Sequence, residues 1–122
     1  MKANYEDLIE AKQYSTDEVE VGTWYNGKKM YRRILNFAMT GAASTTTTQN
    51  INLSSWGITT ICFIQGTEYF GSGSALPYPY YTSATDFGVA YFNMGSKIFT
   101  VRYQYNDATG RYLVFEITYL KD

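Results

Sequence analysis

Histidine is absent from this chain of 122 residues, and cysteine occurs only once. Without histidine the chain lacks the commonest general base and metal ligand of proteins. A single thiol can neither form an intrachain disulfide nor complete a zinc or copper site. Cys62 lies in the apolar run from Ile58 to Ile64, which favours a small buried hydrophobic residue over a nucleophile. The sequence therefore predicts no metal and no cofactor.

Clusters of charge and long apolar runs are also missing. The net charge is −1, and the ten basic residues form no cluster longer than a pair, so we expect no nucleic-acid partner. No run approaches the roughly 20 apolar residues that span a bilayer, and the first residues lack the apolar core of a secretion signal. We expect a protein that is soluble as made, with no membrane insertion.

Motifs of known catalytic chemistry do not occur. The sequence has no nucleophile elbow, and the GSGS segment at Gly71–Ser74 lacks the lysine and helix of a phosphate-binding loop. Paired carboxylates alone can hydrolyse a glycosidic bond. The candidates are Glu68 and Asp86, expected in loops, and Glu116, expected on the last strand, but no spacing brings two of them together. We predict no enzymatic activity and no catalytic residues.

Aromatic residues are abundant, at 18% of the chain with thirteen tyrosines, and 45% of the residues are hydrophobic. This composition argues against disorder, and the length suits one domain with its own core. So many aromatic side chains exceed what one small core holds. Several are therefore expected at interfaces with other subunits or ligands.

A β-hairpin is predicted around Asn26-Gly27, because alternating residues from Val19 to Tyr25 lead into the dipeptide best suited to a two-residue type I′ turn. The return strand extends from Lys28 to about Met39. In this register Glu20 lies opposite Arg33 and Trp24 lies opposite Lys29, which predicts an ion pair and a cation–π contact.

A short helix is predicted over residues 4–12. Asn4 can cap its start, and Tyr5, Leu8 and Ile9 share one face. A helix of this length is marginal in isolation, so its apolar face must dock on the domain, on sister helices or on another protein.

The middle of the chain indicates further short strands. Thr40 to Asn50 lacks periodicity and predicts a loop, although its threonines could equally form a sheet edge. Ile58 to Gln65 is apolar on both faces and is predicted to be the central core strand. Gly66 to Ser74 is predicted to be a connector. The prolines of the segment from Leu76 to Thr82 exclude a regular interior strand.

The last third predicts three strands, over Phe87 to Met94, Ile98 to Tyr105 and Tyr112 to Leu120, joined by tight loops as a meander. With the earlier segments this gives seven or eight short strands. The fold class expected is all-β, an antiparallel β-sandwich or jelly roll with a short N-terminal helix.

Tyrosines near the middle of the chain are candidate sugar-binding residues. Aromatic faces stack on pyranose rings while neighbouring polar groups satisfy the hydroxyls. The predicted glycan-binding set is Tyr69, Tyr78, Tyr80 and Tyr81. Packing of these rings between subunits is an equally weighted alternative.

The hairpin region also carries a family resemblance. The pattern from Tyr14 to Arg33, YSTDEVEVGTWYNGKKMYRR, with weaker echoes at Leu76-Pro77-Tyr78 and Ile117-Thr118-Tyr119, resembles the C-terminal head domain of bacteriophage tail fibres and related virion fibre proteins. The resemblance implies a homotrimeric β head that attaches the virion to host surface glycans. It does not identify a binding site.

Thirteen residues precede this pattern, whereas the family's head usually caps a long shaft. The expected organisation is an N-terminal helical anchor at residues 1–13 and a fibre head domain at residues 14–122. This favours a short spike, head fibre or decoration protein, with a threefold bundle of Tyr5, Leu8 and Ile9 as anchor and trimer contact.

The leading functional prediction is a trimeric virion protein, made in the host cytoplasm, that binds host cell-surface carbohydrate. It is anchored to other virion proteins of the capsid, collar or tail. The alternative is a structural head-fibre or capsid decoration protein that cements the particle and never contacts the host.

Overall fold

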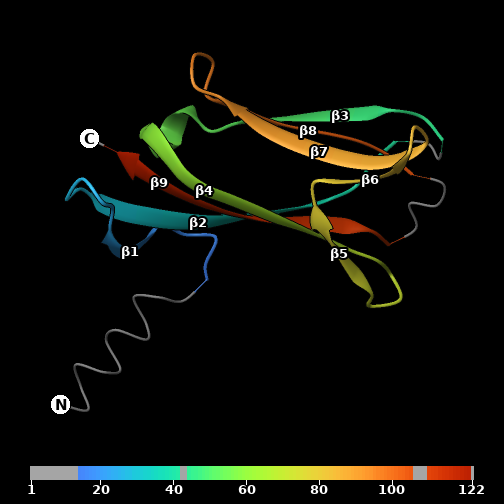
Figure 1. The fold of residues 1–122 in the computed structure, drawn as a ribbon, viewed down its shortest axis with the longest axis horizontal. Helices are drawn as coiled ribbons and strands as arrows, with labels where there is room; N and C mark the ends of the chain where they lie inside the picture. Colours follow the sequence, from blue (N-terminus) through green and yellow to red (C-terminus); the bar gives the residue numbers. More distant parts are fainter. Residues whose placement is uncertain (1–13, 42–43, 106–109, 122) are drawn as a thin grey trace, which may run out of the picture.

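Nine β-strands in two antiparallel sheets form the part of the chain that the computed structural model describes, residues 14–41, 44–105 and 110–121 (Figure 1). The five-stranded sheet has the order β1-β2-β9-β4-β5, and the four-stranded sheet has the order β3-β8-β7-β6. The strands are β1 (Val19–Thr23), β2 (Lys29–Ala38), β3 (Thr47–Asn52), β4 (Ile58–Tyr69), β5 (Ala75–Tyr78), β6 (Tyr80–Ser83), β7 (Asp86–Asn93), β8 (Ile98–Gln104) and β9 (Tyr112–Lys121).

The all-β class and the packing of two antiparallel sheets are therefore confirmed. The described residues contain no α-helix, only a 3₁₀ turn at Ser54–Trp56 before β4. The predicted helix, with Tyr5, Leu8 and Ile9, lies outside the described residues, and the trimer stays a prediction.

The core lies between the sheets and is supplied mainly by β8 and β9. Alternate residues of β9, from Leu113 through Phe115 to Tyr119, are at most 1% exposed. They face β8, where the Phe99 ring meets the Phe115 ring edge-on at 4.9 Å. Each such side chain contributes about 1.5–3 kcal/mol through burial.

The prediction that Ile58–Gln65 forms the central core strand is wrong. These residues belong to β4, where Phe63 is 52% exposed. The central position belongs to β9, which pairs with β2 on one side and β4 on the other. Two partner strands and the facing sheet bury β9, whereas the outer face of β4 meets solvent.

The predicted meander is also wrong. Strands β7 and β8 form a hairpin, but the chain then crosses from the four-stranded to the five-stranded sheet to form β9 (Figure 1). The connection between Gln104 and Tyr112 is long enough to span the roughly 10 Å between packed sheets.

The β1–β2 hairpin forms with a different turn from the one predicted. The N–H of Trp24 donates to the Lys28 carbonyl at 2.8 Å, and the N–H of Gly27 donates to the Trp24 carbonyl at 2.9 Å. These bonds close a loop of Tyr25, Asn26 and Gly27, in which only Gly27 has a positive φ, +85°. A three-residue loop that ends in a left-handed glycine replaces the type I′ turn.

The longer loop shifts the hairpin register. Thr23 now lies opposite Lys29, and Glu20 lies opposite Tyr31 beyond a bulge. The predicted pairing of Glu20 with Arg33 is wrong, because Glu20 makes its ion pair with Lys29 at 3.4 Å. The Trp24 ring packs edge-on against Phe63 at 5.4 Å.

Several irregular segments are sheet edges. Thr47–Asn52 forms edge strand β3, which confirms the alternative of a threonine-rich edge. The proline-containing segment forms edge strands β5 and β6, one in each sheet, separated by the cis Tyr78–Pro79 peptide bond. The prediction that the prolines exclude an interior strand is therefore confirmed. Glu68, expected in a connector, lies inside β4.

Candidate functional site

A groove of about 470 Å³ lies on the outer face of the five-stranded sheet, away from the core. Its walls and floor combine aromatic rings with hydroxyl, amide and carboxylate groups. Its lining residues are Tyr14, Ser15, Thr16, Ile34, Asn36, Gln65, Thr67, Tyr69, Val114 and Glu116.

Strand register builds the floor of this groove. Glu116 on the central strand β9 lies between Ile34 of β2 and Gln65 of β4. Val114, two residues away on the same face, lies between Asn36 and Thr67. Because alternate residues of a strand share a face, these two rows point outward while Phe115 and Ile117 point into the core.

One wall is the segment from Tyr14 to Thr16. The N–H of Ile34 donates to the Ser15 carbonyl at 2.8 Å, and Nε of Arg33 donates to the Thr16 carbonyl at 3.0 Å. The Tyr14 ring covers the Arg32 guanidinium, with 3.9 Å between its centroid and Cζ. These contacts hold Tyr14 beside the groove, although 67% of the residue is exposed.

The far end of the groove is marked by Tyr69. Its ring stacks on Tyr112, the residue directly opposite on β9, with the centroids 5.0 Å apart. The two residues from Glu116 to Val114 and the two from Val114 to Tyr112 span roughly 13 Å along the strand. Two tyrosine rings thus flank a floor of polar and aliphatic side chains.

Glu116 supplies the charge of the groove. Its Oε1 lies 3.6 Å from Nη1 of Arg32, with side-chain exposures of 25% for Glu116 and 10% for Arg32. The arginine lies beneath the Tyr14 ring, whereas the Glu116 side chain is partly open to solvent. A carboxylate can accept several hydrogen bonds, so one ion pair leaves it acceptor capacity.

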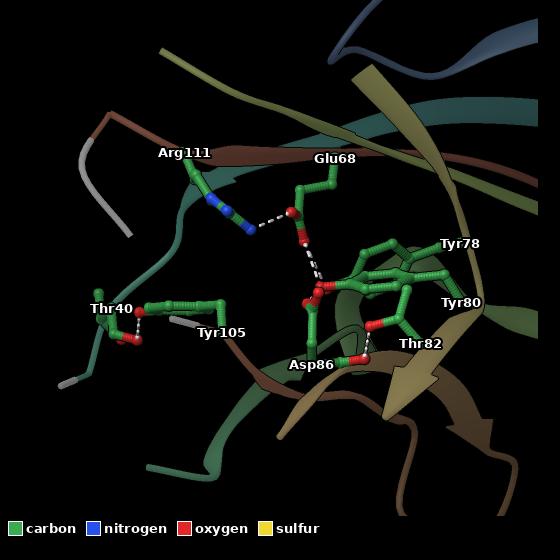
Figure 2. A network of polar contacts seen from close by, with 8 residues as sticks. All are labelled: Thr40, Glu68, Tyr78, Tyr80, Thr82, Asp86, Tyr105 and Arg111. Carbon is green, nitrogen blue, oxygen red and sulfur yellow. Dashed lines mark hydrogen bonds and ion pairs between the residues drawn. The ribbon is translucent and has the colours of Figure 1, made fainter. Parts of the chain in front are cut away.

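A second polar cluster is closed (Figure 2). Glu68, which is 0% exposed, accepts a hydrogen bond from Nη1 of Arg111 at 2.9 Å and one from the Tyr78 hydroxyl at 3.1 Å. The Tyr80 hydroxyl lies 3.4 Å from both Glu68 and Asp86. Burial raises the pKa of Glu68, although its hydrogen bond with Tyr78 and the Arg111 charge act in the opposite direction.

This closed cluster, formed by Glu68, Tyr78, Tyr80, Asp86 and Arg111, joins the two sheets. Glu68 belongs to the five-stranded sheet, whereas Tyr80 and Asp86 belong to the four-stranded sheet. The Arg111 guanidinium also lies over the Phe70 ring at 4.3 Å. Because the Glu68 carboxylate is fully enclosed, the cluster stabilises the sandwich and does not meet a ligand.

The four tyrosines predicted to bind glycan lie in three different environments, with Tyr78 and Tyr80 together in the closed cluster. Tyr78 is 9% exposed with its hydroxyl bonded to Glu68, so its ring offers no face to a sugar. Tyr80 is half-buried in the closed cluster, and Tyr81 is 73% exposed on β6. Tyr69 lines the groove on the outer face of the five-stranded sheet.

The sequence interpretation missed most of the groove. Asn36, Gln65, Thr67 and Glu116 are separated along the chain and converge only through the pairing of β2, β9 and β4. One available signal was Tyr14-Ser15-Thr16, the start of the resemblance pattern. Another was the outward alternation of polar residues on the two long strands.

Other chemistry finds little support among the described residues. They contain no group of three or more histidine, cysteine, aspartate or glutamate residues placed to hold a metal ion. No helix within residues 14–41, 44–105 and 110–121 is long and apolar enough to cross a membrane.

Comparison with known proteins finds no family model, no curated protein and no solved structure that matches this chain. The resemblance to virion fibre heads therefore stays a prediction.

Proposed function

We propose that this chain is the head domain of a bacteriophage virion fibre and that it binds host surface glycans through the groove on the five-stranded sheet. The observation that carries the proposal is the lining of this groove, in which the rings of Tyr14 and Tyr69 flank the side chains of Asn36, Gln65 and Glu116. The pattern resembling fibre heads begins with the residues that form one wall of the groove.

The chemistry of this lining suits a saccharide. Amides and hydroxyls both donate and accept hydrogen bonds, as sugar hydroxyls do, while tyrosine rings offer faces to the apolar C–H surface of a pyranose. The lining residues follow β2, β9 and β4 from Glu116 towards Tyr69, which suits a chain of sugar units.

Assembly as a homotrimer on the virion is part of the proposal. The four-stranded sheet exposes Val89 (40%), Tyr91 (56%) and Tyr81 (73%), an apolar set available to sister chains or to capsid, collar or tail proteins. The same set favours a second candidate function, a decoration protein that cements the particle. Light scattering tests the assembly, and a monomer would contradict it.

The decisive experiment is competition of the purified protein with phage adsorption to host cells. We expect Tyr69→Ala to weaken cell binding about tenfold, because it removes a stacking ring at one end of the groove. Tyr25→Ala, which removes a tyrosine that is 89% exposed in the β1–β2 loop outside the groove, is the matched control and should bind as the wild type does.

Unchanged binding by Tyr69→Ala would remove the groove from the proposal. A wild-type protein that binds purified virions but neither host cells nor their glycans would favour the cementing function.

A further inference from the structure

We infer that the groove selects uncharged saccharides and rejects anionic ones, with Glu116 as the specificity-determining residue. The inference rests on the proposed function, because it names the chemical class of glycan that the groove would accept. Anionic saccharides here are those that carry uronic acids, other sugar carboxylates or phosphate.

The charge of the groove supports this selection. Of the ten described residues that line it, Glu116 alone is charged, and the other nine are aromatic, aliphatic, hydroxyl or amide residues. The nearby cation, Arg32, is 10% exposed and lies under the Tyr14 ring at 3.9 Å. A ligand in the groove therefore meets the carboxylate and not the guanidinium.

Because of the position of Glu116, a ligand in the groove must lie close to its charge. Glu116 lies on the central strand of the floor, with Ile34 on one side and Gln65 on the other. Its side chain is 25% exposed, so water screens the charge less than it would at an open surface. A ligand carboxylate or phosphate above Ile34, Glu116 and Gln65 would therefore be repelled by the partly desolvated Glu116 carboxylate.

The same carboxylate favours neutral sugars. A carboxylate accepts hydrogen bonds from hydroxyl groups, and such charge-assisted bonds are stronger than neutral ones. Gln65 beside Glu116, and Asn36 in the next row, both donate and accept. Neighbouring hydroxyls of a neutral sugar can thus form hydrogen bonds with Glu116, Gln65 and Asn36 at the same time.

The test uses matched probes that differ in charge. Oligosaccharides of polygalacturonate, alginate and hyaluronate are printed on an array with bacterial surface polysaccharides, each as the acid and after carboxyl reduction. We expect the wild type to bind reduced forms roughly tenfold more tightly than the corresponding acids, because like charges oppose binding.

Two variants assign the selection to Glu116. Glu116→Gln keeps the shape and removes the charge, and should bring the ratio of the two affinities close to one. Glu20→Gln is the matched control, because it removes a carboxylate of an exposed pair outside the groove, and it should leave the ratio unchanged. Gln65→Lys places a cation opposite Glu116 while retaining the glutamate. It should also bring the ratio of the two affinities close to one, so the test holds even if Glu116→Gln folds poorly.

The failures are distinguishable. Equal binding of acids and reduced forms by the wild type, or equal changes in Glu116→Gln and Glu20→Gln, overturns the charge selection and leaves glycan binding in place. Binding of no saccharide in either form overturns the proposed function and this inference with it.

Discussion

Two glutamates of the five-stranded sheet are each paired with an arginine, but they lie on opposite faces of the sheet. Glu68 points into the sandwich, is 0% exposed and contacts Arg111 and Tyr78. Glu116 points outward, with its side chain 25% exposed and 3.6 Å from Arg32. Similar chemical pairs thus occupy a closed and an open environment.

The difference separates stability from binding. Around Glu68, Arg111 and two tyrosine hydroxyls enclose the carboxylate, so breaking the cluster leaves polar groups buried without partners. Around Glu116, solvent and unused acceptor capacity leave room for a ligand. A charged pair at the surface of a groove is therefore the better candidate for recognition, although the buried pair is the more tightly bonded.

The largest expected effect is the loss of stability on removing Glu68. Glu68→Ala leaves Arg111 and the Tyr78 hydroxyl without their buried partner, and should lower the free energy of unfolding by about 3–5 kcal/mol. Glu116→Ala, the matched change on the outer face, should cost about 1–2 kcal/mol, because the buried Arg32 loses its carboxylate but keeps its contact with the Tyr14 ring. Urea unfolding measures both, and equal losses would contradict the distinction between the two pairs.

A smaller loss is expected from crowding Tyr78. A methyl group added at Gly88 would lie 2.3 Å from Cζ of Tyr78, so Gly88→Ala must displace this ring from Glu68. We expect destabilisation of about 1–3 kcal/mol. The control is Gly95→Ala in the β7–β8 turn, where the nearest atom is Asn93 Oδ1 at 3.3 Å.

Thermal unfolding measures the Gly88 effect, while glycan binding in the groove should survive it. A Gly88→Ala protein as stable as Gly95→Ala would show that Tyr78 can move without cost.

Period-two alternation was sufficient to predict the all-β class and most strands. It could not identify the core strand, because an apolar run such as Ile58–Ile64 has the same appearance whether one or both faces are covered. The burial of β9 comes from pairing with β2 and β4, whose residues are distant in sequence. Similarly, Asn26-Gly27 is compatible with loops of two or three residues. The structure has the three-residue loop, and its hairpin register therefore differs from the predicted one.

The candidate site was less accessible to prediction for the same reason. Tyr78, Tyr80 and Tyr81 are close in sequence, but the Tyr78 and Tyr80 rings meet at 5.4 Å in the closed cluster, whereas Tyr81 is exposed on β6. Glu68 and Arg111 are 43 residues apart, and the groove residues come from three strands and the segment before β1. Of the four tyrosines predicted to bind glycan, Tyr69 alone lines the groove.

The smallest expected effect is in the pH dependence of stability, because two glutamates act in opposite directions. Burial raises the pKa of Glu68, so its contribution to stability grows as pH falls through its folded pKa towards 4.5, the ordinary glutamate value. For Glu18, burial acts to raise the pKa, but bonds from Lys121 and Tyr119 outweigh it and hold the pKa below 4.5. The contribution of Glu18 is therefore lost only as pH falls below that value.

The variant Glu68→Gln isolates the buried carboxylate, since glutamine keeps its volume and an acceptor for Tyr78. We expect the stability of the wild type relative to this variant to increase as pH falls from about 7 to about 4.5. Relative to Glu18→Gln, the wild type should instead lose stability below that range. Urea unfolding at a series of pH values gives both differences. A constant difference between the wild type and Glu68→Gln would mean that the closed cluster does not disfavour the charge of Glu68, and the contrast with Glu116 would then rest on accessibility alone.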